Sequence, residues 1–138
     1  MIILDASFIV KLVLQEENSS QTRGLLRKWV LEGEHFATVD LALPEALNAI
    51  WKHANGIGDI SREEAIQAAE DLLKIWKKLK QYQSMSIAEE ALNLALDEGI
   101  TVYDALYLQL AKTGGGKLAT YDREMRKIAK KHGIMTYP

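Results

Sequence analysis

Cysteine is absent from the 138-residue chain, proline occurs only twice, and no apolar run approaches the ~20 residues that span a membrane. Without cysteine, the chain can have no disulfide framework, zinc–thiolate site, iron–sulfur cluster or thiol nucleophile. The first residues show no basic segment followed by a long apolar one, so we expect no signal peptide and a cytoplasmic location. Hydrophobic residues form 48% and charged residues 26% of the chain, as in ordinary globular proteins. We therefore expect one domain over residues 1–138.

Neither sign of charge is in large excess, because 17 basic and 19 acidic residues give a formal net charge of −2. Taken alone, this balance argues against a nucleic-acid partner, which usually requires an excess of basic charge. The charge is unevenly distributed, however. Residues 111–138 carry seven basic and two acidic side chains and sum to +5, which leaves −7 for the first 110 residues. The basic segment is either a solvated helix face or a surface that follows phosphates, and its position alone does not decide between them.

Short apolar segments alternate with longer segments of helical periodicity. We expect capping boxes at Ser61 and Ser86 and a helix that has Pro44 as its first residue. The expected strands are residues 2–4, 35–39, 117–121 and 134–136. The expected helices are residues 7–14, 19–32, 44–55, 101–112 and 122–132. Two further helices are expected after the capping boxes, one after Ser61 with apolar positions from 66 to 79 and one after Ser86 that ends at Gly99. This alternation predicts an α/β fold with a small, mainly parallel sheet covered by helices on both faces.

Several catalytic motifs are missing from the sequence. Gly56-Ile57-Gly58 has no third glycine and follows a helix, unlike a dinucleotide-binding loop. Gly116-Lys117 is followed by leucine and precedes a strand, unlike a P-loop. The three histidines have no metal-ligand spacing, and no Gly-x-Ser-x-Gly elbow occurs. These absences argue against hydride transfer, P-loop chemistry, zinc chemistry and triad hydrolysis.

Four acidic residues from distant parts of the sequence share one expected location. Asp5 ends the first strand, Glu45 and Asp104 lie in the first turns of two helices, and Asp122 follows the 117–121 strand. In an open α/β sheet the carboxyl ends of the strands and the amino ends of the helices form one edge, where ligands bind. We expect the four carboxylates to converge there.

Each of these acids also has a purely structural interpretation. Aspartate is a favoured helix cap, and acids in a first helical turn interact well with the helix dipole. Asp5 and Asp104 fit this interpretation least well, because both stand in very apolar segments where an unpaired carboxylate is costly. No lysine or arginine lies within three residues of Asp5, Glu45 or Asp104. A hard divalent cation such as Mg²⁺ or Mn²⁺ is the natural counter-charge for such a cluster, and it suits phosphodiester hydrolysis.

The segments around the four acids form a recognisable series. They read Ile-Leu-Asp5-Ala-Ser7-Phe-Ile-Val-Lys-Leu, Pro44-Glu45-Ala-Leu-Asn48-Ala, Thr101-Val-Tyr-Asp104-Ala-Leu-Tyr107-Leu-Gln-Leu-Ala111 and Leu118-Ala-Thr120-Tyr-Asp122. In this order, and over essentially the whole chain, they resemble the motifs of PIN-domain proteins, specifically the VapC-type toxin ribonucleases of prokaryotic toxin–antitoxin pairs.

The resemblance implies a PIN-like three-layer α/β/α fold and a set of roles. Asp5, Glu45, Asp104 and Asp122 would hold Mg²⁺ or Mn²⁺, directly or through water. Ser7 and Thr120 would hydrogen-bond these ligands or the attacking water. Members of the family are generally small homodimers that cleave RNA and are held inactive by a cognate antitoxin.

We therefore expect a metal-dependent endoribonuclease, with the basic residues 123–131 steering RNA toward the acidic site. Three alternatives remain open: a PIN-domain nuclease that processes RNA or cuts DNA without being a toxin, a phosphoryl-transfer protein, and a binding module whose acids only cap helices. The second is disfavoured, because a receiver-like domain needs an acidic pair at its first strand, and a haloacid-dehalogenase-type phosphatase needs aspartate where Ser7 stands.

Overall fold

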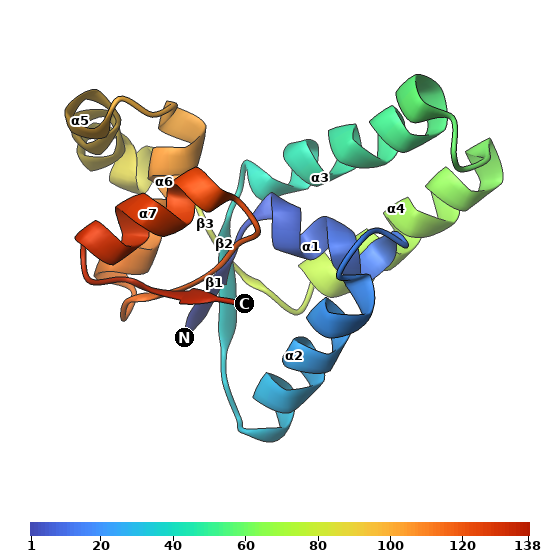
Figure 1. Ribbon diagram of the computed structural model, residues 1–138, viewed down its shortest axis with the longest axis horizontal. Coiled ribbons are helices and arrows are strands. Elements are labelled where there is room, and N and C mark those ends of the chain that lie inside the picture. Colours follow the sequence, from blue (N-terminus) through green and yellow to red (C-terminus); the bar gives the residue numbers. More distant parts are fainter.

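The computed structural model describes residues 1–138 and has a five-stranded sheet between two layers of helices (Figure 1). The strands are β1 (Ile2–Leu4), β2 (Phe36–Val39), β3 (Lys80–Tyr82), β4 (Lys117–Ala119) and β5 (Met135–Tyr137). They pair in the order β3-β2-β1-β4-β5, and every pair is parallel. The first strand of the chain is therefore the central strand of the sheet.

The helices lie on both faces of the sheet. They are α1 (Ala6–Val13), α2 (Ser19–Leu31), α3 (Ala42–Trp51) continued by a π-helical segment (Lys52–Ile57), α4 (Arg62–Trp76), a 3₁₀ turn (Ser84–Ile87), α5 (Ala88–Glu98), α6 (Val102–Thr113) and α7 (Arg123–Lys131). Figure 1 shows α5, α6 and α7 on one side of the strands and α1, α2 and α4 on the other, with α3 and α4 extending outward as an antiparallel pair. This arrangement confirms the expected α/β fold with a small parallel sheet covered on both faces.

Burial explains the most apolar segments of the sequence. The three residues of β1 are fully buried, because a parallel sheet covered on both faces needs apolar residues on both. Helix α6 is buried along residues 105–111, since it packs against β1, β2 and β4 on one side and α5 on the other. Its apolar character is thus accounted for within one copy of the chain. None of the helices combines the length and hydrophobicity needed to cross a lipid bilayer.

The structure differs from the sequence-based expectation at the starts of two helices and in having one additional strand. The strand β3 was not expected, because its sequence Lys-Gln-Tyr is polar and it is held as an edge strand by β2. The Ser61 capping box is present, but the one expected at Ser86 is not: the Ser86 hydroxyl donates to the Gln83 carbonyl, and Ile87 occupies the cap position of α5. Helix α3 begins at Ala42, so Pro44 is its third residue rather than its first.

The strand order fixes where a site can lie. After β1 and β2 the chain builds outward to β3, and it then returns to the other side of β1 to add β4 and β5. The order reverses between β1 and β4, and ligands of open parallel sheets bind at the carboxyl ends of the strands at such a switch point. We call this end of the sheet, where β1 leads to Asp5 and β4 leads to Thr120, the carboxyl edge.

Candidate active site

Asp5 stands at the switch point, directly after β1, and is 3% exposed. Its Oδ1 accepts hydrogen bonds from the backbone N–H of Phe8 at 2.9 Å and from the Ser7 hydroxyl at 2.7 Å. Its Oδ2 accepts a short hydrogen bond from the Thr120 hydroxyl. The first bond makes Asp5 the N-cap of α1, as the structural interpretation predicts. The other two bonds come from side chains that the sequence places in the same site.

The segment after β4 is joined to Asp5 through two hydroxyls. Thr120 Oγ1 donates to Asp5 and accepts from the Asp122 backbone N–H at 3.0 Å. Ser7 Oγ donates to Asp5 and accepts from the Tyr121 backbone N–H at 3.0 Å. Asp122 in turn caps α7, because its Oδ1 accepts from the Met125 N–H at 2.9 Å. Ser7 and Thr120 therefore lock the ends of β1 and β4 together and orient Asp5.

Glu45 projects from the first turn of α3 and is oriented by Tyr107, which is not one of the six predicted site residues. The hydroxyl of Tyr107, a residue of α6 that is 2% exposed, donates to Glu45 Oε1 at 2.9 Å. Glu45 Oε2 has no hydrogen-bond partner in the chain. Tyr107 lies within the third quoted segment, but nothing in the sequence indicates that a residue 62 positions from Glu45 would contact it.

Asp104 lies in the first turn of α6. Its backbone N–H donates to the hydroxyl of the cap residue Thr101 at 3.2 Å, and the same hydroxyl interacts with the Asp104 carboxylate and lowers its pKa. The carboxylate of Asp104 forms no ion pair with a basic side chain.

The four carboxylates interact electrostatically as a connected group. Burial is the largest cause of a raised pKa for Asp5, which reaches about 6 despite three hydrogen bonds that lower it, and the charge of Glu45 raises it further. Burial also raises the pKa of Glu45, opposed by the Tyr107 hydrogen bond and assisted by the charge of Asp104. The pKa of Asp104 is raised by burial and then by the charge of Asp122.

No basic side chain neutralises this cluster. The ion pairs of the chain involve other acids, and none includes Asp5, Glu45, Asp104 or Asp122. Like charges are therefore held together at the carboxyl edge without a cationic partner from the protein. Such a donor set of carboxylate and hydroxyl oxygens is chemically suited to a hard divalent cation.

The side chains are gathered at one place, but they do not form a ready-made coordination shell. No three of the chain's acidic and histidine side chains converge on a single ion position. Asp5, Glu45 and Asp122 each use one or both carboxylate oxygens in hydrogen bonds within the protein. Charge interactions link Asp5 to Glu45, Glu45 to Asp104 and Asp104 to Asp122, so the structure brings these acids near one another in pairs. The donor chemistry fits a hard divalent cation, and metal binding stays a prediction.

The cluster opens onto a hollow of about 380 Å³. Ser7, Glu45 and Asp122 line it, together with Lys11 and Glu16 from the α1–α2 region and with Tyr121. We call it the acidic hollow. Of the four carboxylates, Glu45 and Asp122 line this hollow, whereas Asp5 and Asp104 do not.

The fold and this edge define a class: a small three-layer α/β protein with an uncompensated acidic site at the switch point of a parallel sheet. The sequence profile of the PIN domain matches residues 2–131. The chain belongs to the PIN domain family.

Two curated relatives come from the archaeon Pyrobaculum aerophilum. The chain is 39% identical over 124 residues to a protein named Ribonuclease VapC3, a match that covers 90% of this chain and 91% of the relative. It is 34% identical over 108 residues to a protein named Exonuclease VapC9, covering 78% of this chain and 76% of the relative. These likenesses agree with the resemblance to VapC-type proteins that the four segments carry.

Two solved structures share the fold. PAE2754 from Pyrobaculum aerophilum superimposes with a TM-score of 0.72 at 30% identity, covering 98% of this chain and 82% of that one. FitAcB from Neisseria gonorrhoeae superimposes with a TM-score of 0.63 at 18% identity, covering 100% of this chain and 97% of that one. The second likeness concerns the fold alone.

Proposed function

We propose that the chain is a metal-dependent endoribonuclease that hydrolyses RNA phosphodiester bonds, and that it is the toxin of a toxin–antitoxin pair. The observation that carries the proposal is the group of four carboxylates at the carboxyl edge, none of which has a basic partner and three of which, Asp5, Glu45 and Asp104, have raised pKa values. Family membership and the relative named as a ribonuclease support the choice of RNA as substrate.

In this proposal Asp5, Glu45 and Asp104 hold the principal Mg²⁺ or Mn²⁺, and Asp122, with Thr120, completes the site or holds a second ion. A bound ion of this kind supplies charge stabilisation for the phosphate and lowers the pKa of a bound water. Hydrolysis adds a water oxygen to phosphorus and breaks the bond from phosphorus to one bridging oxygen.

The protein's own contribution is to fix the ligands before substrate arrives. Ser7 and Thr120 hold the two oxygens of Asp5, so that its carboxylate plane is set by β4 as well as β1. Tyr107 holds Glu45 Oε1 and leaves Oε2 directed to other partners. Such preorganisation reduces the rearrangement that binding and reaction require.

The decisive experiment is cleavage of a mixed panel of linear and circular RNAs and a DNA control, with Mn²⁺ or with EDTA. We expect RNA cleavage that needs the ion and that acts on circles, since a circle has no end for an exonuclease. Asp104→Asn should abolish the activity while circular dichroism shows an intact fold. Asp97→Asn on the exposed face of α5 is the matched control and should cleave normally. Full activity of Asp104→Asn, or activity undiminished by EDTA, would contradict the mechanism.

Attack on linear RNA alone would favour an exonuclease, the activity in the name of the second relative, and cleavage of DNA would favour the DNA-cleaving alternative. A folded chain that cleaves neither nucleic acid and shows no Mn²⁺-dependent rise in melting temperature would favour the non-catalytic binding module.

The proposal includes a cognate antitoxin and a homodimer, both of which come from the family resemblance, and a cytoplasmic location, which comes from the sequence pattern of the first residues and the lack of long apolar runs. Growth arrest on expression, relieved by a small protein encoded beside this chain, tests the toxin role. A housekeeping nuclease would show cleavage without growth arrest. Sedimentation of the purified chain tests the dimer.

A further inference from the structure

A second hollow adjoins the acidic one, and Tyr121 lines both. This second hollow, of about 430 Å³, is lined by Glu17, Asn18, Gln21, Tyr121, Arg123, Arg126 and Pro138. We call it the basic hollow, because two arginines face one glutamate there, whereas three carboxylates face one lysine in the acidic hollow. A ligand that crosses Tyr121 passes from negative to positive surroundings.

Arg126 is fixed in the basic hollow by the same residue that orients Asp5. Its Nε and Nη2 donate to the Thr120 backbone carbonyl at 3.1 and 2.9 Å, while the Thr120 hydroxyl donates to Asp5. The guanidinium carbon lies 5.8 Å from the centre of the Tyr121 ring. Arg126 forms no ion pair with a carboxylate of the chain, so its charge and its Nη1 hydrogens remain available beside the site.

The Tyr121 side chain lies between the two hollows and is held in place by contacts with two other elements. Its ring stacks on Phe8 with centroids 6.1 Å apart, and its hydroxyl bonds to Thr22 of α2. The Lys11 ammonium, from α1, lies 4.9 Å from the ring centre. Cations from two helices therefore flank the Tyr121 ring. Lys11 is paired with Glu16 at 3.8 Å, whereas Arg126 has no carboxylate partner.

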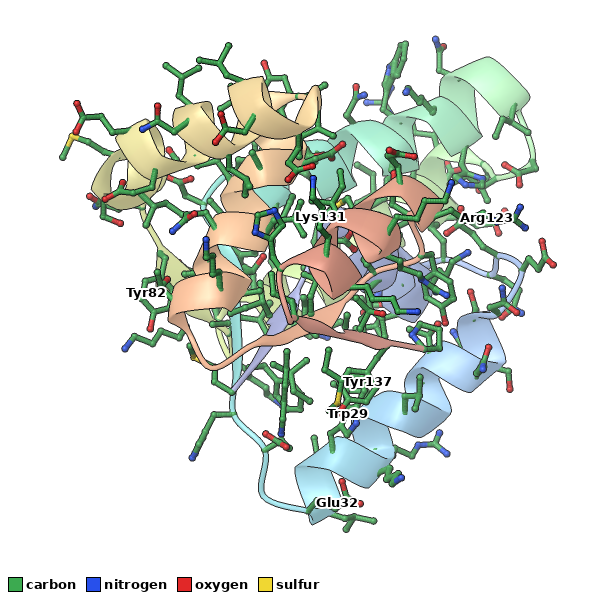
Figure 2. All side chains as sticks on the ribbon, turned by 60° about the vertical axis from the view of Figure 1, so that its left-hand side comes forward. Trp29, Glu32, Tyr82, Arg123, Lys131 and Tyr137 are labelled. Carbon is green, nitrogen blue, oxygen red and sulfur yellow. The ribbon has the colours of Figure 1, made fainter.

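Of the remaining basic residues of α7, Lys127 and Lys130 are exposed and only Lys131 forms an ion pair. Lys131, at the far end of the helix, is paired with Glu98 at 3.0 Å, and neighbouring His132 bonds to the same carboxylate at 2.8 Å. Figure 2 labels Arg123 and Lys131 at the two ends of α7. What distinguishes Arg123 and Arg126 from the exposed lysines of α7 is that the two arginines line the basic hollow beside Tyr121.

We propose that Arg123 and Arg126 form a phosphate subsite for the RNA strand beside the cleaved bond, and that Tyr121 separates this subsite from the acidic hollow. The inference rests on the proposed ribonuclease function. Arginine suits the role because its planar guanidinium binds phosphate oxygens through two hydrogen bonds. The strand lies with one phosphate at the carboxylates and a neighbouring phosphate at the arginines, so the subsite sets its path and binding strength rather than the chemical step.

The test is binding of a fluorescent single-stranded RNA decamer, measured by anisotropy at several salt concentrations. Asp104→Asn serves as the background, so that the RNA is not cleaved. On it we place Arg123→Gln, Arg126→Gln, the double replacement, and Lys130→Gln as an exposed control further along α7. We expect the double replacement to weaken binding at least tenfold and Lys130→Gln to change it less than twofold. The salt dependence should become shallower by about 0.7 in logarithmic slope for each lost phosphate contact.

Cleavage kinetics in the active protein provide the second readout. Arg123→Gln should raise KM and leave kcat within about twofold, because Arg123 makes no bond within the protein that its loss would disturb. Equal effects of Arg123→Gln and Lys130→Gln on binding and salt slope would overturn the subsite, as would the absence of measurable RNA binding. Failure of the ribonuclease proposal is distinguishable, since it appears as no cleavage by the unmodified chain even where the decamer is bound.

Discussion

The two edges of the sheet treat their acidic residues in opposite ways. At the amino edge, before the strands begin, Glu34 is bonded to Lys117 at 2.5 Å and lies 3.6 Å from the amino group of Met1. The hydrogen bond from Lys117 is the main cause of a lowered pKa for Glu34. At the carboxyl edge, burial and mutual repulsion raise the pKa values of Asp5, Glu45 and Asp104.

Glu34 thus has a structural role, whereas the acids of the carboxyl edge have no positively charged partner within the chain. The charge of Glu34 is compensated within the fold, so it helps to hold β1, β2 and β4 in register. The charges at the carboxyl edge are compensated by nothing in the chain and weaken the folded state until a ligand supplies positive charge. Sites that bind charged ligands commonly cost stability in this way.

The largest expected effect is on the rate of RNA cleavage, which a substitution at the carboxyl edge should lower strongly and a substitution at the amino edge should leave nearly unchanged. Glu45→Gln keeps the size of the side chain but removes a charge of the acidic cluster, and we expect its RNA cleavage rate to fall at least 100-fold, about 2.7 kcal/mol of barrier. Glu34→Gln should stay within twofold of the unmodified chain. Initial rates on one RNA with saturating Mn²⁺ measure both, and a similar loss in the two variants would erase the distinction between the edges.

The next effect is on the pH dependence of stability in metal-free buffer. The pKa of Asp5 is raised from 3.8 to about 6, so the folded state binds its proton more tightly than the unfolded state does. The resulting stability is present at low pH and is lost as the pH rises from about 4 to about 6. The loss is on the order of 3 kcal/mol.

Urea unfolding of the unmodified chain and of Asp5→Asn across this range isolates the contribution, because the asparagine oxygen still caps α1. Parallel pH curves for the two proteins would show that Asp5 does not carry the effect. Glu34 has the opposite sign: its lowered pKa supplies stability that is lost as the pH falls, so Glu34→Gln should lose its stability deficit in acid.

Metal binding should stabilise the protein through the carboxyl edge only. An ion at 100 times its Kd stabilises a folded state by about 2.7 kcal/mol, which for a domain of this size raises Tm by several degrees. We expect this rise with Mn²⁺ in the unmodified chain and in Glu34→Gln, and a much smaller one in Asp104→Asn. Thermal unfolding followed by circular dichroism measures it; an unchanged Tm in the unmodified chain would contradict the metal site.

The smallest effect concerns the metal-free stability of single neutralised variants. Asp104→Asn removes a repelled charge and should stabilise the protein by about 0.5 kcal/mol, given the screening of a half-exposed group. Glu34→Gln breaks a compensated charge and should destabilise it. Chemical denaturation at pH 7 with EDTA gives the change in the free energy of unfolding for both variants. If the two changes had the same sign, the acids of the two edges would not differ in their effect on stability.

The sequence predicts the fold and the place of the acids because both follow from local patterns. Apolar segments ending at Asp5 and before Asp122, alternating with helices, suffice to place those residues at the same end of parallel strands. Strand β3 could not be predicted in this way, because Lys80, Gln81 and Tyr82 have no apolar periodicity and become a strand only by pairing with β2.

Side-chain contacts between distant helices are the other part that the sequence does not contain. The hydrogen bond from Tyr107 to Glu45 depends on the angle between α3 and α6, and the bond from Arg126 to the Thr120 carbonyl depends on how α7 leaves β4. The aromatic contact of Trp29 with Tyr137, 5.0 Å between ring centres, is of the same kind and joins α2 to the last strand (Figure 2). Each is set by packing rather than by spacing.

The position of β1 at the centre of the sheet has a consequence for synthesis of the protein. Asp5 is made 115 residues before Thr120, whose hydroxyl holds its Oδ2. A growing chain on the ribosome therefore has no assembled site until β4 has emerged and paired with β1. A chain built in this order cannot act on any RNA, its own messenger included, until Thr120 has been made and its hydroxyl has bonded to Asp5.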